Sequence, residues 1–215
     1  MPEKPRPRPG VGGSAGRVIA GVARGRRLVA PGAGTRPLGD RVKQSLFAII
    51  EPEVRDGAFL DLFAGSGAAG IEALSRGARV AVFVERNANA GQVIERNLRT
   101  ASLEGASVRI VKADVISWLA GETRGGRGDE GPFAAIVIDP PYDEPQLLGR
   151  AVAAIAAAGP GGILADHGVA VAKHFRGASP GSRHGLLRSA REARFGETTL
   201  TFYRWSTADD GEEVG

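Results

Sequence analysis

The feature that most constrains this chain is a regular alternation of short apolar segments with helical ones between residues 58 and 172. Five strands are predicted there, at Phe59–Phe63, Val80–Val84, Val108–Val111, Ala134–Ile138 and within Gly162–Ala172. Four helices are predicted between them, at Ala68–Ser75, Asn87–Ala101, Val115–Leu119 and Gln146–Ala158. Strands that alternate with helices pair in parallel, and the helices cover both faces of the sheet. The pattern therefore predicts an α/β fold.

The segments on either side of this alternation extend the fold. Leu186–Phe195 and Thr198–Trp205 predict two strands across a turn at Gly196, which adds an antiparallel edge. Arg17–Pro31 predicts a β-hairpin, and Asp40 is expected to cap the helix that follows. We expect four units along the chain: a disordered basic tail rich in Pro and Gly at 1–16, a hairpin and helix at 17–52, the α/β domain at 53–206, and a flexible acidic tail at 207–215.

Charge is distributed unevenly along the chain. The net charge is +4, but residues 1–48 hold ten Lys or Arg and only two acidic residues, so the remainder is mildly acidic. A basic segment on an acidic body is typical of an arm that binds a polyanion such as nucleic acid. A solvated basic tail has the same composition, so charge alone leaves both interpretations open.

Several kinds of site are excluded by what the sequence lacks. Without cysteine there are no disulfides, no thiolate catalysis and no cysteine-ligated metal. The three histidines show no i, i+4 pairing, so we expect no metal site. No apolar stretch reaches the roughly 18 residues of a membrane span, and the first residues lack the apolar segment of a secretory signal. We expect a cytoplasmic protein that does not bind membranes and is a monomer.

A glycine loop follows the first predicted strand of the α/β domain. Gly65–Gly70 matches the G-x-G-x-x-G pattern that binds dinucleotides, between a strand and a helix. Glu85 lies twenty residues past Gly65, at the end of the next strand, where a carboxylate can hold two ribose hydroxyls. A nicotinamide-dependent oxidoreductase is therefore one candidate.

Asp61 argues against a dinucleotide at this loop. A carboxylate about 4 Å from a pyrophosphate charge is repelled by roughly 4 kcal/mol at an effective dielectric near 20. The same carboxylate suits S-adenosylmethionine, which carries an ammonium and a sulfonium and no phosphate. Asp61 could instead be a structural or helix-capping residue.

Asp114 follows the third predicted strand, where it could accept a hydrogen bond from an adenine amino group, cap the next helix, or do both. We expect S-adenosylmethionine to contact Asp61, Phe63, Gly65, Ser66, Gly67, Glu85, Asp114 and Val115.

The sequence Asp139-Pro140-Pro141-Tyr142 follows the fourth predicted strand. Two prolines fix the backbone and remove two donors, so that carbonyl groups point outward. A carboxylate, a free carbonyl and an aromatic ring can together hold a planar base by its exocyclic amino group. Asp139 and the Pro140 carbonyl would accept from the two N–H groups, and Tyr142 would stack on the unstacked base. An Asx-Pro turn is the structural alternative for this tetrad alone. We predict Asp139, Pro140 and Tyr142 as catalytic residues.

Further motifs extend the pattern outside the α/β core. They are Arg17–Gly21 with Gly25–Leu28, Thr35-Arg36-Pro37, Asp40–Phe47 and Phe195–Leu200. With the glycine loop, Glu85 and the DPPY tetrad, they make the chain similar, over about residues 17–205, to the bacterial family that methylates the N2 amino group of one guanine, guanine 966, in 16S ribosomal RNA. The chain departs from that family at Leu38, usually Thr, and Ala48, usually Asn. These departures put in doubt a polar contact near the site and a hydrogen bond beside the cofactor.

The resemblance implies a Rossmann-like class I methyltransferase with a seven-stranded sheet, mostly parallel, whose last strand is antiparallel. It also implies S-adenosylmethionine as cofactor and 16S ribosomal RNA, within a 30S subunit or an assembly intermediate, as partner. We expect phosphate contacts from basic residues of the N-terminal extension, namely Arg17, Arg24, Arg26, Arg27, Arg36, Arg41 and Lys43. Two alternatives stay open besides the oxidoreductase: methylation of another planar amine, such as adenine N6 or a glutamine amide, and a non-catalytic RNA-binding assembly factor.

Overall fold

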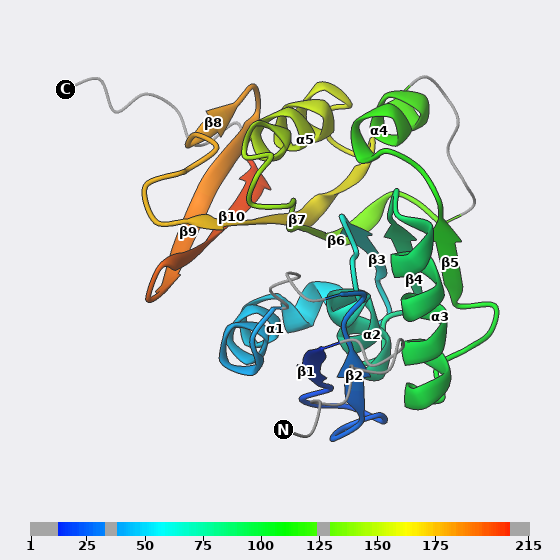
Figure 1. The fold of residues 1–215 in the computed structure, drawn as a ribbon. Coiled ribbons are helices and arrows are strands. Elements are labelled where there is room, and N and C mark those ends of the chain that lie inside the picture. The colour runs from blue at the N-terminus through cyan, green and yellow to red at the C-terminus, as the bar shows by residue number, and fades with distance from the viewer. Residues whose placement is uncertain (1–12, 33–37, 124–129, 207–215) are drawn as a thin grey trace.

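The centre of the molecule is one eight-stranded sheet with the strand order β5-β4-β3-β6-β7-β10-β9-β8 (Figure 1). The computed structural model describes residues 13–32, 38–123 and 130–206. Its strands are β3 Ala58–Leu62, β4 Val80–Val84, β5 Val108–Val111, β6 Phe133–Ile138, β7 Leu164–Phe175, β8 Arg183–His184, β9 Leu187–Phe195 and β10 Thr198–Trp205. The five strands from β5 to β7 are parallel, and β10 is antiparallel to both its neighbours, β7 and β9.

The predicted fold class is therefore confirmed. In the set of seven strands from β5 to β9, only the last in sequence, β10, runs against the others. The two-residue strand β8 adds an eighth strand at the edge, antiparallel to β9, which the sequence did not indicate. It is too short to have a pattern of its own.

Helices cover both faces of the sheet, as the alternation predicted. On one face lie α1 Asp40–Val54, α2 Ala68–Ser75 and α3 Ala88–Ala101, and on the other lie α4 Val115–Thr123 and α5 Gln146–Ala157. In Figure 1, α4 and α5 lie above the sheet, and α1 and α2 lie below it. No helix in the described ranges is long and apolar enough to cross a membrane.

The core consists of two apolar layers, one on each face of the sheet. Successive side chains of a strand point to opposite faces, so Phe59 packs on the α1–α2 side and Leu60 on the α4–α5 side. All five residues of β3 are buried, as expected of a parallel strand covered on both faces. Asp61 is the one charged residue in that strand, and it points to the α1–α2 side with Phe59.

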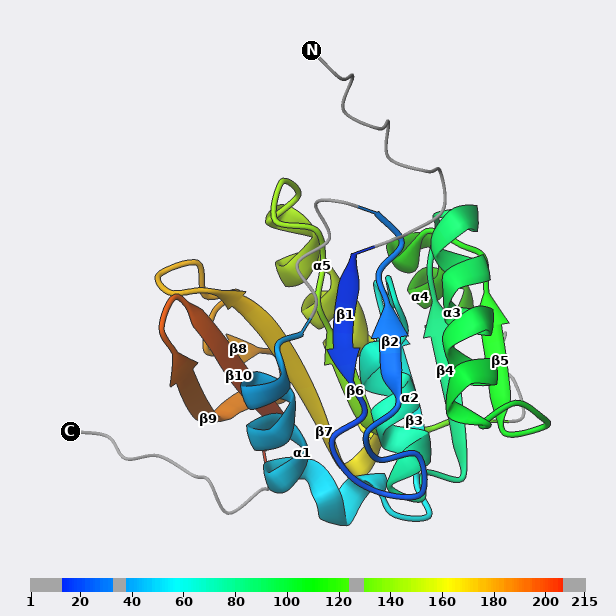
Figure 2. The ribbon, with the colours of Figure 1, turned by 60° about the horizontal axis from the view of Figure 1, so that its bottom comes forward.

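The N-terminal extension is a separate two-stranded sheet, β1 Ser14–Arg17 paired antiparallel with β2 Arg27–Val29. Figure 2 shows it lying beside α1, α2 and α3. The hairpin is confirmed, but it begins at Ser14, so the expected tail at 1–16 ends too late. Asp40 does not cap α1: the N-cap is Gly39, and Asp40 instead accepts from Arg17. The rest of that tail, at 1–12, and the acidic tail at 207–215 lie outside the described residues.

Candidate active site

A cavity of about 640 Å³ opens at the carboxyl ends of β3, β4, β6 and β7. Open α/β sheets bind their ligands at this edge, where successive loops meet. Nine predicted cofactor or catalytic residues line the cavity: Asp61, Phe63, Gly65, Ser66, Glu85, Val115, Asp139, Pro140 and Tyr142. Gly67 and Asp114 are predicted cofactor residues that do not line it. The fold thus gathers into one cavity residues that are up to 81 positions apart (Asp61 to Tyr142).

The glycine loop has a backbone that few residues other than glycine adopt. Gly65 and Gly67 have φ values of 54° and 74°, and Phe63 has a φ of 60°, which is rare for a non-glycine residue. A Cβ atom at Gly70 would lie 2.2 Å from the Phe83 ring, so this glycine permits the helix to pack on the sheet. The pattern therefore serves both ligand approach and helix packing.

Glu85 fixes the glycine loop from the end of the next strand. Its Oε2 accepts from the Gly65 backbone N–H at 2.9 Å, and its Oε1 accepts from the Asn87 backbone N–H at 2.8 Å. A carboxylate has about four lone-pair directions, so two remain for a ligand. Glu85 lines the cavity, and its two remaining lone-pair directions are what its predicted role in holding ribose hydroxyls requires.

Asp61 is buried and also faces the cavity. Its Oδ2 accepts from the backbone N–H of Gly70 at 2.9 Å, so Asp61 has a structural role, which was one of the two alternatives for this residue. Burial raises the pKa of Asp61 to about 8; the Gly70 hydrogen bond opposes the rise, and the charges of Asp139 and Glu85 add to it. A ligand that brings positive charge would stabilise the ionised carboxylate and lower this pKa, whereas a pyrophosphate would raise it further.

Asp114 has the capping role. Its Oδ1 accepts from the Ser117 backbone N–H at 2.9 Å, and this hydrogen bond is the main reason that the pKa of Asp114 is lowered. The next residue, Val115, lines the cavity. The adenine contact that we predicted for Asp114 stays a prediction.

The partner of Asp139 was not predicted from the sequence. Lys173, near the end of β7, donates from Nζ to both Asp139 oxygens, at 2.7 and 2.8 Å. The Tyr142 ring lies against Phe175, with centroids 4.3 Å apart, and Lys173 Nζ lies 5.0 Å from the Tyr142 centroid. A signal was present, because a lysine that directly follows the apolar run Val169–Ala172, in a strand covered on both faces, requires a buried anion. The sequence alone does not say which anion.

The predicted RNA contacts divide into exposed and buried groups. Arg17, Arg24, Arg26, Arg27 and Arg41 are exposed, and Arg36 lies outside the described residues. The turn that carries Arg24 and Arg26 is fastened to the far end of α2, where Val22 N–H donates to the carbonyl oxygen of Ser75 at 2.9 Å. These arginines therefore lie at the opposite end of α2 from the cavity.

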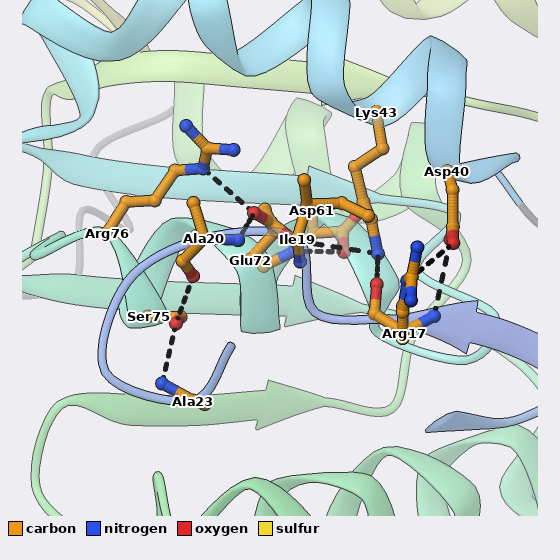
Figure 3. A network of polar contacts seen from close by, with 11 residues as sticks. Arg17, Ile19, Ala20, Ala23, Asp40, Lys43, Asp61, Glu72, Ser75 and Arg76 are labelled. Carbon is orange, nitrogen blue, oxygen red and sulfur yellow. Dashed lines mark hydrogen bonds and ion pairs between the residues drawn. The ribbon is translucent and has the colours of Figure 1, made fainter. Parts of the chain in front are cut away.

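The prediction that Lys43 contacts RNA is wrong. Its side chain has no exposed surface; Nζ donates to the Arg17 carbonyl oxygen and lies 3.5 Å from Glu72 Oε2. Glu72, equally buried, accepts from the backbone N–H groups of Ile19 and Ala20 and from Arg76 (Figure 3). Lys43 therefore helps to fasten the hairpin to α1 and α2, and it cannot reach a phosphate.

Comparison with known proteins places the chain in a family. A family model described as "Conserved hypothetical protein 95" matches residues 16–204. The chain belongs to this family. It is 36% identical over 189 residues to YlbH of Bacillus subtilis, provisionally named an rRNA methyltransferase, covering 87% of this chain and 98% of YlbH.

Other relatives agree on the class of protein. The chain is 39% identical to ribosomal RNA small subunit methyltransferase D of Escherichia coli over 127 residues, which is 59% of this chain and 60% of the relative. The solved structure of YhhF from Escherichia coli, provisionally named a methyltransferase, superposes with a TM-score of 0.73 at 31% identity, covering 88% of this chain and 97% of that one. The expected relationship to bacterial rRNA methyltransferases is confirmed, and the chain is a methyltransferase.

The two departures from the family pattern lie in different surroundings. Leu38 is buried and lines the cavity, so a leucine here replaces whatever polar contact a threonine would make with a ligand. Ala48 is exposed on α1 and does not line the cavity. The expected loss of a hydrogen bond beside the cofactor at Ala48 stays a prediction.

One ion pair at the cavity rim was not predicted from the sequence. Arg86, which lines the cavity, forms an ion pair with Glu144 and so joins the loop after β4 to the loop after β6.

Within 13–32, 38–123 and 130–206, no group of three His, Asp or Glu side chains is placed to hold a metal ion.

Proposed function

We propose that this protein transfers a methyl group from S-adenosylmethionine to the N2 amino group of guanine 966 in 16S ribosomal RNA. The observation that carries the proposal is the set of three carboxyl groups in the cavity: Asp61, Glu85 and Asp139 all line it beside the glycine loop. Family membership supports an rRNA substrate, because the relatives named above are rRNA methyltransferases.

The residues present fit S-adenosylmethionine. The buried Asp61, with its pKa raised to about 8, favours a ligand that brings positive charge, and this ligand carries two cationic groups. Glu85 has lone pairs left for ribose hydroxyls, and Val115 offers an apolar contact for the adenine ring. When bound, S-adenosylmethionine supplies a methyl group already activated by the positive sulfur.

The protein's task is then to hold and orient the accepting amine. The amino nitrogen of guanine is a poor nucleophile, because its lone pair is delocalised into the ring. Hydrogen bonds from its N–H groups to Asp139 and the Pro140 carbonyl would hold it and orient its lone pair toward the methyl carbon. Methyl transfer would form the N–C bond and leave the electron pair of the S–C bond on sulfur, so no residue of the protein has to activate the leaving group. The nitrogen then loses one proton, which Asp139 is placed to accept and pass to solvent.

The RNA itself would contact the exposed arginines of the N-terminal extension. Arg24, Arg26 and Arg27 lie near the end of α2 that is remote from the cavity, so the RNA must extend along the molecule from the flipped guanine to the hairpin. A folded small-subunit particle offers such an extended surface. We therefore propose a 30S subunit or assembly intermediate as substrate, which places the protein in the cytoplasm.

The deciding experiment is methyl transfer from radiolabelled S-adenosylmethionine to 30S particles from cells that lack the activity. We expect label in 16S RNA, on N2 of guanine 966, after digestion and mass mapping. Label on adenine N6 or on protein would replace the proposed substrate, and RNA binding without label would indicate an assembly factor. Calorimetric binding of NADH without binding of S-adenosylmethionine would establish the oxidoreductase.

A further inference from the structure

Lys173 is a charged residue that the proposed mechanism has not yet used. Its side chain is 5% exposed and lies in β7 after the buried residues Val169–Ala172. Burial of an ammonium without a partner costs free energy, so Lys173 requires an anionic group beside it. That group is Asp139, whose side chain is 23% exposed and reaches the cavity.

The geometry of this pair constrains Asp139 strongly. One ammonium donates to both carboxylate oxygens, at 2.7 and 2.8 Å, which opposes rotation of the carboxylate about its last bond. The strand register brings the two residues together, because Ile138 pairs with Ala172, and Asp139 and Lys173 are the residues that follow them. Tyr142 is held beside the same ammonium, 5.0 Å from ring centroid to Nζ.

The burial of Asp139 explains why such a partner is needed. Asp61 from β3 and Glu85 from the loop after β4 are carboxylates that line the same cavity, and Tyr142 lies in the same loop as Asp139. Burial raises the pKa of Asp139, and the ammonium of Lys173 opposes that rise. If Asp139 took up a proton, it would lose an acceptor position that the amino group needs.

We infer that Lys173 is a positioning residue for methyl transfer: its ammonium holds Asp139 ionised and oriented, while lone pairs of Asp139 remain for the substrate amine. The inference rests on the proposed function and deepens it. Lys173 acts through Asp139 and need not touch either substrate. A purely structural ion pair would instead leave the pH dependence of the reaction unchanged.

The test compares Lys173→Met, which removes the charge at similar length, with Lys173→Arg, which keeps it. Turnover on 30S particles is measured from about pH 5.5 to 9, and S-adenosylmethionine affinity is measured by calorimetry. We expect Lys173→Met to lower kcat about 100-fold near pH 7 and to move the acidic limb of kcat upward by about one to three pH units. Affinity should change less than about threefold, and Lys173→Arg should restore the acidic limb toward its original pH.

A second measurement does not depend on activity. The carboxyl carbon of Asp139 is titrated by ¹³C NMR in the wild-type protein and assigned with Asp139→Asn. We expect this carboxyl to be ionised at pH 7 in the wild type and to titrate at higher pH in folded Lys173→Met.

Two results would overturn the inference. One is an Asp139 carboxyl that is protonated at pH 7 in the wild-type protein. The other is a folded Lys173→Met enzyme whose acidic limb does not move, whether its kcat is unchanged or is lowered equally at every pH. A wild-type protein that methylates no RNA would refute the proposed function instead, and the NMR titration would still decide the pairing.

Discussion

The carboxylate of Asp61 accepts a hydrogen bond from the backbone N–H of Gly70 at 2.9 Å while it also lines the cavity. One side chain therefore holds the start of α2 against the sheet and offers negative charge to a ligand. Both tasks favour the ionised carboxylate, whereas burial disfavours it and raises the pKa of Asp61 to about 8 in the ligand-free protein. Its replacement should separate the stability of the protein from its affinity for the ligand.

Asp61→Asn should stabilise the ligand-free protein at high pH. An aspartate titrates near 3.9 in an unfolded chain, so between about pH 4 and pH 8 the folded wild type holds a proton that the unfolded chain has lost. Its stability therefore falls as the pH rises through this range. Asparagine removes that loss and can still accept from Gly70. We expect Asp61→Asn to be roughly 1 to 4 kcal/mol more stable at pH 8, with the difference shrinking toward pH 4.

Urea unfolding at several pH values measures this difference, with Asp166→Asn, an exposed residue that does not line the cavity, as the control. The same Asp61→Asn protein should bind S-adenosylmethionine at least about tenfold more weakly, because a carboxylate partner of the cation is removed. Equal stability curves would contradict the buried titration, and unchanged affinity would contradict the cationic ligand.

Asp139→Ala should abolish methyl transfer while S-adenosylmethionine binding survives. The substitution removes the acceptor for the substrate amine, so we expect kcat to fall at least about 100-fold. Asp139→Asn is the matched control for shape, because it keeps one acceptor oxygen without the charge. Single-turnover kinetics and calorimetry measure the two effects, and turnover at the wild-type rate in Asp139→Ala would remove Asp139 from the mechanism.

Glu72→Ala should release the N-terminal hairpin from the α/β domain. Glu72 accepts from the backbone N–H groups of Ile19 and Ala20, at 2.7 and 3.0 Å, and from Arg76. Without it, two part-buried backbone donors lose their partner and the buried Lys43 ammonium loses its counter-charge, which costs about 3 to 5 kcal/mol. Denaturant unfolding measures the loss, and hydrogen exchange should locate it in β1 and β2. Glu95→Ala, on the exposed face of α3, is the control and should change stability by less than about 0.5 kcal/mol. An equal, small effect of both variants would show that the network does not hold the hairpin.

Removal of the hairpin charges should weaken RNA binding and flatten its dependence on salt. For every phosphate that the protein no longer neutralises, the slope of log K against log salt falls by about 0.7 to 0.9. We expect the triple change of Arg24, Arg26 and Arg27 to Gln to lower the slope by up to about 2 to 3. The same change at Arg150, Arg183 and Arg191, exposed on α5, β8 and β9, removes equal charge elsewhere. If the two triple variants show the same slope, the arm has no special role.

Much of the candidate site could be predicted because its residues follow directly from local patterns. Asp61, Glu85 and Asp139 each come at or just after the end of an apolar strand, and parallel strands end at one edge of the sheet. Local sequence was a poorer guide to burial in the extension. Lys43 lies on a helix near other basic residues, and nothing in that segment shows that Glu72, 29 positions later, is buried beside it.

The sequence by itself determined the alternation of strands and helices, the glycine loop and the DPPY tetrad, because each depends on neighbouring residues or on a fixed period. Only the tertiary structure decided which charges meet. The pairing of Lys173 with Asp139 depends on the register between β6 and β7, and that of Lys43 with Glu72 depends on how α1 packs against α2. Such contacts join residues far apart in the chain, and the packing of whole elements, rather than any local preference, sets their distance.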